Sequence, residues 1–165
     1  MRFAVIIIGI VLSVILQATW LSGNDLPLLL KPDLVLVIVI SYSLLNGPYQ
    51  GTNIGLFAGF FMDLVAGNII GVGALCKMLA GFSAGLLEKT IYKDNLLVPV
   101  IAVFVGTIIF ETLDLAIHLS FGANLHFLFF MLHTVLPMAC YNAVLAPLIY
   151  FLINKFENYV AKKNQ

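Results

Sequence analysis

The chain has 165 residues, of which 62% are hydrophobic and only 10% are charged, and its formal net charge is zero. An ordinary soluble domain carries about 25% charged residues, so this composition excludes a soluble globular protein. The balanced charge also gives no reason to expect a nucleic-acid partner. Apolar stretches of membrane-spanning length recur along the sequence, which predicts one all-α membrane domain over residues 1–165.

Six transmembrane helices in a compact bundle are expected along this domain. The first follows Arg2 and has no small-x-small cleavage site, so it is predicted to be retained. Asp33, after Pro32, is expected to cap the second. Helices two to four are short for a bilayer about 30 Å thick, so a re-entrant hairpin of helices three and four, leaving four spans, is an alternative. The expected helices cover residues 3–21, 33–46, 51–67, 71–88, 95–120 and 128–154.

The distribution of lysine and arginine predicts the orientation of these spans. With six spans and a cytoplasmic amino terminus, Lys31 falls on the outer side and the other loop and tail cations fall inside. Both termini are therefore predicted to be cytoplasmic. The expected inner set is Arg2, Lys89, Lys93, Lys155, Lys162 and Lys163.

Counting by fours through the third helix predicts a ridge of glycines that includes one carboxylate, Asp63. Residues four apart lie above one another on a helix, and small-residue ridges in membranes allow another helix backbone to approach closely. The fourth helix repeats the pattern, with Lys77 in place of the carboxylate. The ridge glycines are Gly51, Gly55, Gly59 and Gly67 in the third helix and Gly73, Gly81 and Gly85 in the fourth.

Asp63 and Lys77 lie equally far from the turn at residue 70, and therefore at about the same depth in an antiparallel hairpin. This spacing predicts a buried salt bridge or hydrogen bond between the two side chains. One interpretation is a lock on the register of the two helices, because charges inside membranes commonly pair with one another. The other interpretation is an ion or ligand site.

A second polar cluster is expected toward the outer end of the bundle. Glu111, Asp114 and His118 share one face of the fifth helix, and His133 lies near the outer start of the sixth. These residues are predicted to contact a partner or a ligand, or to form hydrogen bonds between helices. A divalent metal site is a weaker alternative, because no compact ligand spacing accompanies them.

No catalytic residues, cofactor or metal is predicted from the sequence. It contains no nucleophile elbow, phosphate-binding loop or zinc-protease helix. Binding, rather than catalysis, is the expected function.

Two stretches of the sequence carry a resemblance to a known family. They are KPDLVLVIVISYSLLNGPYQG at 31–51 and GLFAGFFMDLVAGNIIGVGALCKMLAGFSAGLLEK at 55–89. Their G-x-x-x-G-x-x-x-D-x-x-x-G-x-x-x-G pattern runs from Gly55 through Asp63 to Gly71. With this pattern the chain resembles the MreD family of rod shape-determining membrane proteins. Lys77 is not part of the family pattern, so the predicted ion pair depends on this sequence alone.

The resemblance implies a non-enzymatic part of the cell-elongation complex in the bacterial cytoplasmic membrane, active in cell shape and lateral-wall peptidoglycan synthesis. The implied main partner is MreC, with MreB, RodA and a class B penicillin-binding transpeptidase in the same complex. The implied fold is similar to the S-components of energy-coupling-factor vitamin transporters. A substrate-binding S-component is therefore the alternative function, with Glu111, Asp114 and His118 lining a vitamin pocket.

Overall fold

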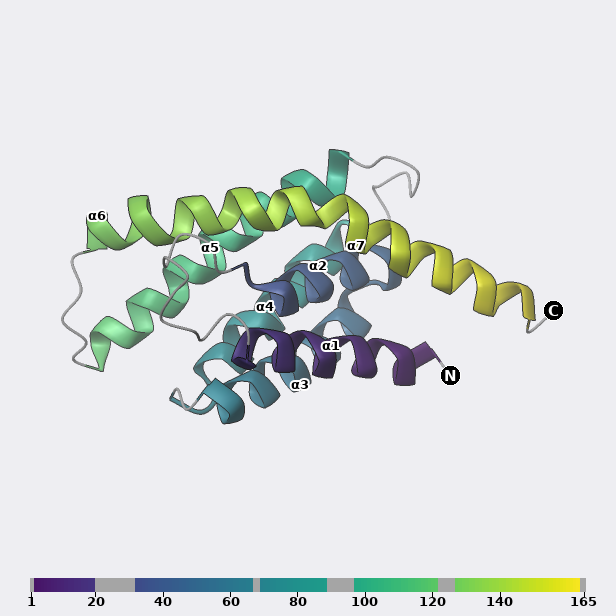
Figure 1. Cartoon of the computed structure of the whole chain (residues 1–165), viewed down its shortest axis with the longest axis horizontal. Helices are drawn as coiled ribbons and strands as arrows, with labels where there is room; N and C mark the ends of the chain where they lie inside the picture. Colours follow the sequence, from purple (N-terminus) through teal and green to yellow (C-terminus); the bar gives the residue numbers. More distant parts are fainter. Residues whose placement is uncertain (1, 20–31, 67–68, 89–96, 122–126, 164–165) are drawn as a thin grey trace.

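The computed structural model describes residues 2–19, 32–66, 69–88, 97–121 and 127–163, and every regular element in these ranges is a helix (Figure 1). α6, η3 and α7 follow one another without a break, so the described ranges contain six continuous helical segments. α1 begins and α7 ends at the same end of the molecule (Figure 1). The elements are α1 (Arg2–Thr19), α2 (Leu34–Asn46), α3 (Pro48–Ala66), α4 (Val72–Leu86), α5 (Leu97–Ser120), α6 (Phe127–Phe130), η3 (Met131–Val135) and α7 (Leu136–Lys163).

Two of the helical stretches in the described ranges, Leu97–Ser120 and Phe127–Val160, are long and apolar enough to cross a membrane. The first has 24 residues and the second has 34. At 1.5 Å per residue, each exceeds the roughly 20 residues that a bilayer core requires. The helices expected at 95–120 and 128–154 correspond to these two stretches.

Two helix boundaries differ from the sequence prediction by three residues or more. The break expected over residues 46–51 contains a single non-helical residue, Gly47, with φ of 87°, and α3 begins at Pro48. Proline suits this first helical position because its φ is already fixed near the helical value and its missing N–H is not needed there. The last helix extends to Lys163 rather than to residue 154, since no glycine or proline interrupts its polar end.

α2 is the central helix of the fold. It contacts α1, α3, α4, α5 and α7, and 10 of its 13 residues are buried. A helix that is apolar on all sides requires such surroundings. Thirteen residues span only about 20 Å at the α-helical rise, but neighbouring helices rather than lipid surround this one.

α3 and α4 pack with their backbones in direct contact. A Cβ on Gly55 would collide with the carbonyl group of Lys77, and a Cβ on Gly81 would collide with the backbone of Gly51. Such contact between small residues is the typical way that membrane helices come close. The structure places six of the predicted ridge glycines in crowded positions: Gly51, Gly55 and Gly59 of α3 and Gly73, Gly81 and Gly85 of α4. Gly67 lies outside the described residues.

The last helical stretch changes its winding before a proline. Pro137 cannot donate a backbone hydrogen bond, and the preceding segment, η3, is π-helical. The N–H of Leu136 reaches back five residues to the carbonyl oxygen of Met131. Farther along, α7 contains Pro147, and its second half turns away from the direction of the first half (Figure 1).

We predict that Gly55→Ala lowers the thermal unfolding midpoint of the purified protein, whereas Gly9→Ala does not. Both changes gain the helix propensity of alanine, about 0.8–1.0 kcal/mol. The new methyl group at residue 55 meets backbone atoms of α4, whereas nothing lies within 4 Å of a Cβ at Gly9 in α1. Overpacking typically costs about 1–3 kcal/mol, which exceeds the propensity gain over most of that range.

Thermal unfolding of both variants in the same detergent provides the measurement. An equal change in the two midpoints would show that α3 and α4 can separate without cost, and would contradict the packing described above.

Candidate functional site: a charged cavity between the helices

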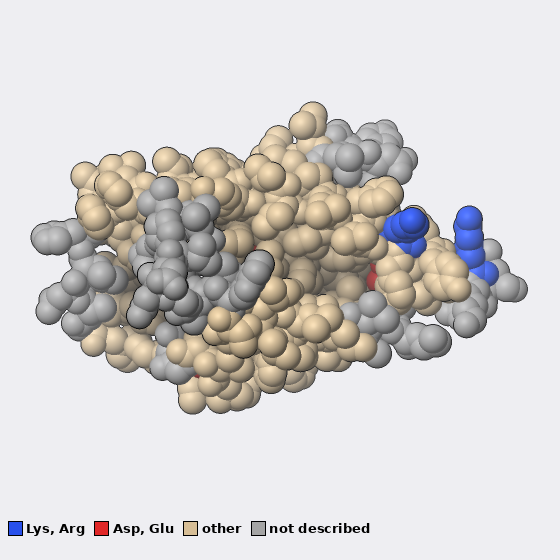
Figure 2. Space-filling view, viewed as in Figure 1, with Lys and Arg blue, Asp and Glu red and all other residues tan. Residues whose placement is uncertain are grey.

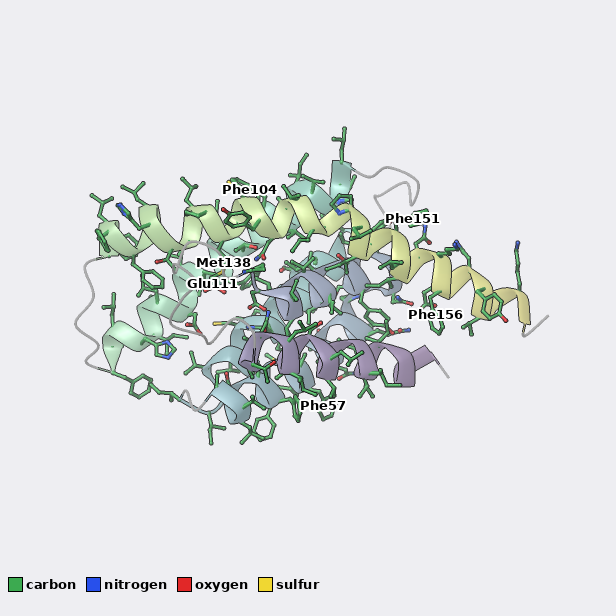
Figure 3. The ribbon with its side chains drawn as sticks, viewed as in Figure 1. Phe57, Phe104, Glu111, Met138, Phe151 and Phe156 are labelled. Carbon is green, nitrogen blue, oxygen red and sulfur yellow. The ribbon has the colours of Figure 1, made fainter. Side chains whose placement is uncertain are left out.

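A cavity of about 410 Å³ lies where the six helical segments meet. This volume falls within the range of about 300–1,000 Å³ that is usual for small-molecule sites. Figure 3 labels Glu111 on α5 and Met138 on α7, whose side chains both line it. Its apolar wall includes Val14, Leu36, Met62, Phe110 and Met138, and its charged lining residues are Asp33, Asp63, Lys77, Glu111 and Asp114.

Asp33 and Lys77 form a buried ion pair in this cavity. The Lys77 Nζ lies 2.9 Å from Asp33 Oδ2, and the two side chains are only 11% and 7% exposed. The other carboxylate oxygen of Asp33 accepts a hydrogen bond of 2.9 Å from the N–H of Leu36, and so caps α2 as the sequence predicts. Asp33 therefore connects the first turn of α2 to the middle of α4.

The predicted pair between Asp63 and Lys77 is wrong. Asp63 Oδ2 instead accepts hydrogen bonds from the N–H groups of Gly71 at 2.9 Å and Ala74 at 3.2 Å. The N-cap residue of α4 is Gly71, which has no side chain to cap the helix, so Asp63 supplies the missing acceptor from α3. The positive end of the helix dipole also favours a carboxylate there.

The physical reason for this error lies in side-chain direction. Equal distance from the turn predicts equal depth, but it does not fix where the long Lys77 side chain points. The backbone of Lys77 packs on Gly55, and its ammonium group reaches α2 rather than α3. Both predicted residues are buried and both line the cavity, but each has a different partner.

Glu111 and Asp114 line the same cavity from α5. Asp114 Oδ2 lies 3.2 Å from Nδ1 of His118, which is one turn later on the helix and is not among the lining residues. Glu111 makes no hydrogen bond or ion pair with any residue that the structure describes, although it interacts electrostatically with Asp33, Lys77 and Asp114. Of the four residues predicted to contact a partner or ligand, Glu111 and Asp114 thus line the cavity. His118 lies outside the lining and contacts Asp114.

His133 does not belong to this cluster. Its ring is exposed and stacks on Phe129, with ring centroids 4.3 Å apart, and it is not among the lining residues. No group of three or more histidine, cysteine or carboxylate side chains suited to a metal ion occurs in the described part of the chain.

From the sequence, Asp33 is expected only as a helix cap, and neither Met138 nor Cys76 is predicted as a cavity residue. The Pro-Asp pair at the start of α2 is a signal for a cap, but nothing in its spacing indicates a partner 44 residues away in α4. Met138 and Cys76 resemble ordinary apolar packing residues, so no local pattern distinguishes them.

A family model described as rod shape-determining protein MreD matches residues 1–160. No curated protein and no solved structure matches the chain.

We predict strong energetic coupling between Asp33 and Lys77. Removing one member of a buried ion pair typically costs about 3–5 kcal/mol, because the remaining charge is left without a partner. Asp33→Asn retains an acceptor for the α2 cap, and Lys77→Met retains the volume of the lysine stem. The double variant is therefore expected to be more stable than the sum of the two single effects implies.

Equilibrium unfolding of the two single variants and the double variant measures this coupling. The matched control is the same cycle with Asp63→Asn and Lys77→Met, which should show a smaller coupling energy. A larger coupling energy in the Asp63 cycle than in the Asp33 cycle would instead support the pair of Asp63 and Lys77 that the sequence predicts.

We further predict that Asp63→Leu destabilises the protein more than Asp63→Asn does. Asparagine keeps an oxygen that can accept from Gly71 and Ala74, whereas leucine leaves those N–H groups without their acceptor. An unsatisfied buried donor costs about 1–3 kcal/mol. The yield of monodisperse protein and its thermal midpoint measure the difference. Equal losses for the two variants would show that the negative charge matters rather than the cap.

Proposed function

Because the chain belongs to the MreD family of rod shape-determining proteins, we propose that it is a non-catalytic membrane scaffold of the bacterial cell-elongation complex. In this role it binds MreC and helps regulate cell shape and peptidoglycan synthesis along the lateral wall. The observation that carries the proposal is the family match over residues 1–160, which includes every described helix except the last three residues of α7.

The surface of the molecule supports a position in the cytoplasmic membrane. Figure 2 shows a face that is mostly uncharged where the structure describes it, with lysine side chains gathered at one end. Large apolar side chains are exposed on α1, α3, α4, α5 and α7, as lipid or partner helices would require. Lys155 and Lys162 are exposed on the last part of α7.

The orientation that we propose has six spans and both termini in the cytoplasm. α1 begins and α7 ends at the same end of the molecule, where Lys155 and Lys162 also lie (Figures 1 and 2). Lysines concentrate on the cytoplasmic side of membrane proteins. The cavity is lined by the last turns of α1, so this orientation places it toward the outer side of the membrane.

A scaffold of this kind acts through its outer helix faces. MreC is the proposed main partner, and MreB, RodA and a class B penicillin-binding transpeptidase are proposed members of the same complex. The close α3–α4 contact supports this role, because tightly packed helices present a fixed surface to a partner at little cost in conformational entropy. The cavity fits the alternative function, a substrate-binding S-component, and the test below separates the two.

We expect MreC to co-purify with the tagged chain from its own cells in a mild detergent, together with wall-synthesis enzymes and without a stoichiometric metabolite. Mass spectrometry of the proteins and small molecules in the eluate provides the measurement. A tagged multi-pass membrane protein of unrelated function, expressed at the same level, is the control. Recovery of ATP-binding-cassette subunits with a bound vitamin would contradict the scaffold role and support the S-component.

A further inference from the structure

The charges that line the cavity are not balanced among themselves. The described lining contains four carboxylates and one ammonium group, that of Lys77. Asp33 is matched by Lys77, and Asp63 is matched by the two N–H groups at the start of α4. Glu111 and Asp114 remain. Both interact electrostatically with Lys77, but neither forms an ion pair with it.

These two carboxylates differ in their surroundings. Asp114 reaches His118, which lies outside the lining. Glu111 has no hydrogen bond or ion pair among the described residues, and it interacts electrostatically with the carboxylates of Asp33 and Asp114 as well as with Lys77. A carboxylate in a region of low dielectric constant is costly unless a positive group lies beside it.

Apart from Gln17, the uncharged residues of the wall are apolar. Val14 of α1, Phe110 of α5 and Met138 of α7 come from three separate helices, so the cavity has an apolar region beside Glu111 and Asp114. An apolar pocket with a few convergent polar groups is the usual form of a small-molecule site. Here the convergent groups are mostly carboxyl groups, which favours a ligand with a cationic head.

We infer that this cavity binds a small organic cation, with a primary ammonium group beside Glu111 and Asp114 and an apolar body against Val14, Phe110 and Met138. The ammonium group can come from a free amine or from the headgroup of an aminophospholipid. The ligand supplies a positive charge for the two carboxylates that do not pair with Lys77. This inference does not depend on the scaffold role proposed above.

The test uses the full-length protein in phosphatidylcholine nanodiscs, with pentylamine as the cationic probe. Pentanol and pentanoate have the same apolar chain but carry a neutral and a negative head, so they are the matched controls. Pentylamine is expected to raise the thermal unfolding midpoint, and the two controls are not. Equal stabilisation by pentanol would show an apolar cavity without charge selection and would overturn the inference.

Cys76 provides a second readout at the site, since its side chain lines the cavity and the residue is only 4% exposed. In a Cys140→Ser background, an amine at about ten times its dissociation constant leaves about one-tenth of the protein free, so alkylation of Cys76 should slow by about tenfold. Glu111→Gln should abolish both effects, and Glu88→Gln, outside the lining, should retain them. Retention of both effects in Glu111→Gln would overturn the assignment to this carboxylate.

Replacing phosphatidylcholine with phosphatidylethanolamine distinguishes the two sources of the ammonium group. A higher midpoint in phosphatidylethanolamine, absent in Glu111→Gln, would identify the lipid headgroup. A response to pentylamine alone would identify a free amine. If neither pentylamine nor phosphatidylethanolamine changes the unfolding midpoint, the cavity does not bind an ammonium group and the inference fails. The wild-type series with the three pentyl probes decides the question even if Glu111→Gln does not fold.

Discussion

The backbone contact between α3 and α4 is the constraint on which the charged interior depends. At Gly55 and Gly81 the two helices lie too close for any side chain, so their relative position is fixed by main-chain atoms. This closeness allows Asp63, at the end of α3, to reach the first N–H groups of α4. It also places the backbone of Lys77 against α3 while its side chain extends toward α2. Wider spacing would leave the start of α4 uncapped.

The buried charges in this protein determine how the helices are arranged more directly than they stabilise the fold. Asp33 uses one oxygen to cap α2 and the other to hold Lys77, so the ion pair ties two helices in a single register. The desolvation of a buried ion pair can cost as much as its attraction returns, so its presence alone is weak support for stability. A function in specifying one arrangement of α2 and α4 is the hypothesis that fits the observed contacts.

The short central helix explains how a polar cavity can exist in so apolar a chain. α2 is surrounded by five other helices, so its ends need not reach the surfaces of a bilayer. Its first turn, with Asp33, is therefore buried among protein side chains, where Lys77, Glu111 and Asp114 face the same space. Carboxylates in the described cavity thus face a space between protein helices, as intramembrane ionisable residues generally do.

The sequence by itself determined the helical class, the approximate positions of the helices and the two glycine ridges, because these depend on local composition and on four-residue periodicity. The family came instead from the resemblance of residues 31–51 and 55–89 to known members. The sequence also identified Glu111 and Asp114 as neighbours on one face of a helix. Only the tertiary structure decided the partners of the charges. The hairpin spacing predicts the depth of Asp63 and Lys77, but not the direction of a long side chain or the approach of α2 from elsewhere in the chain. Partners that come from distant segments are chosen by packing, which no local pattern records.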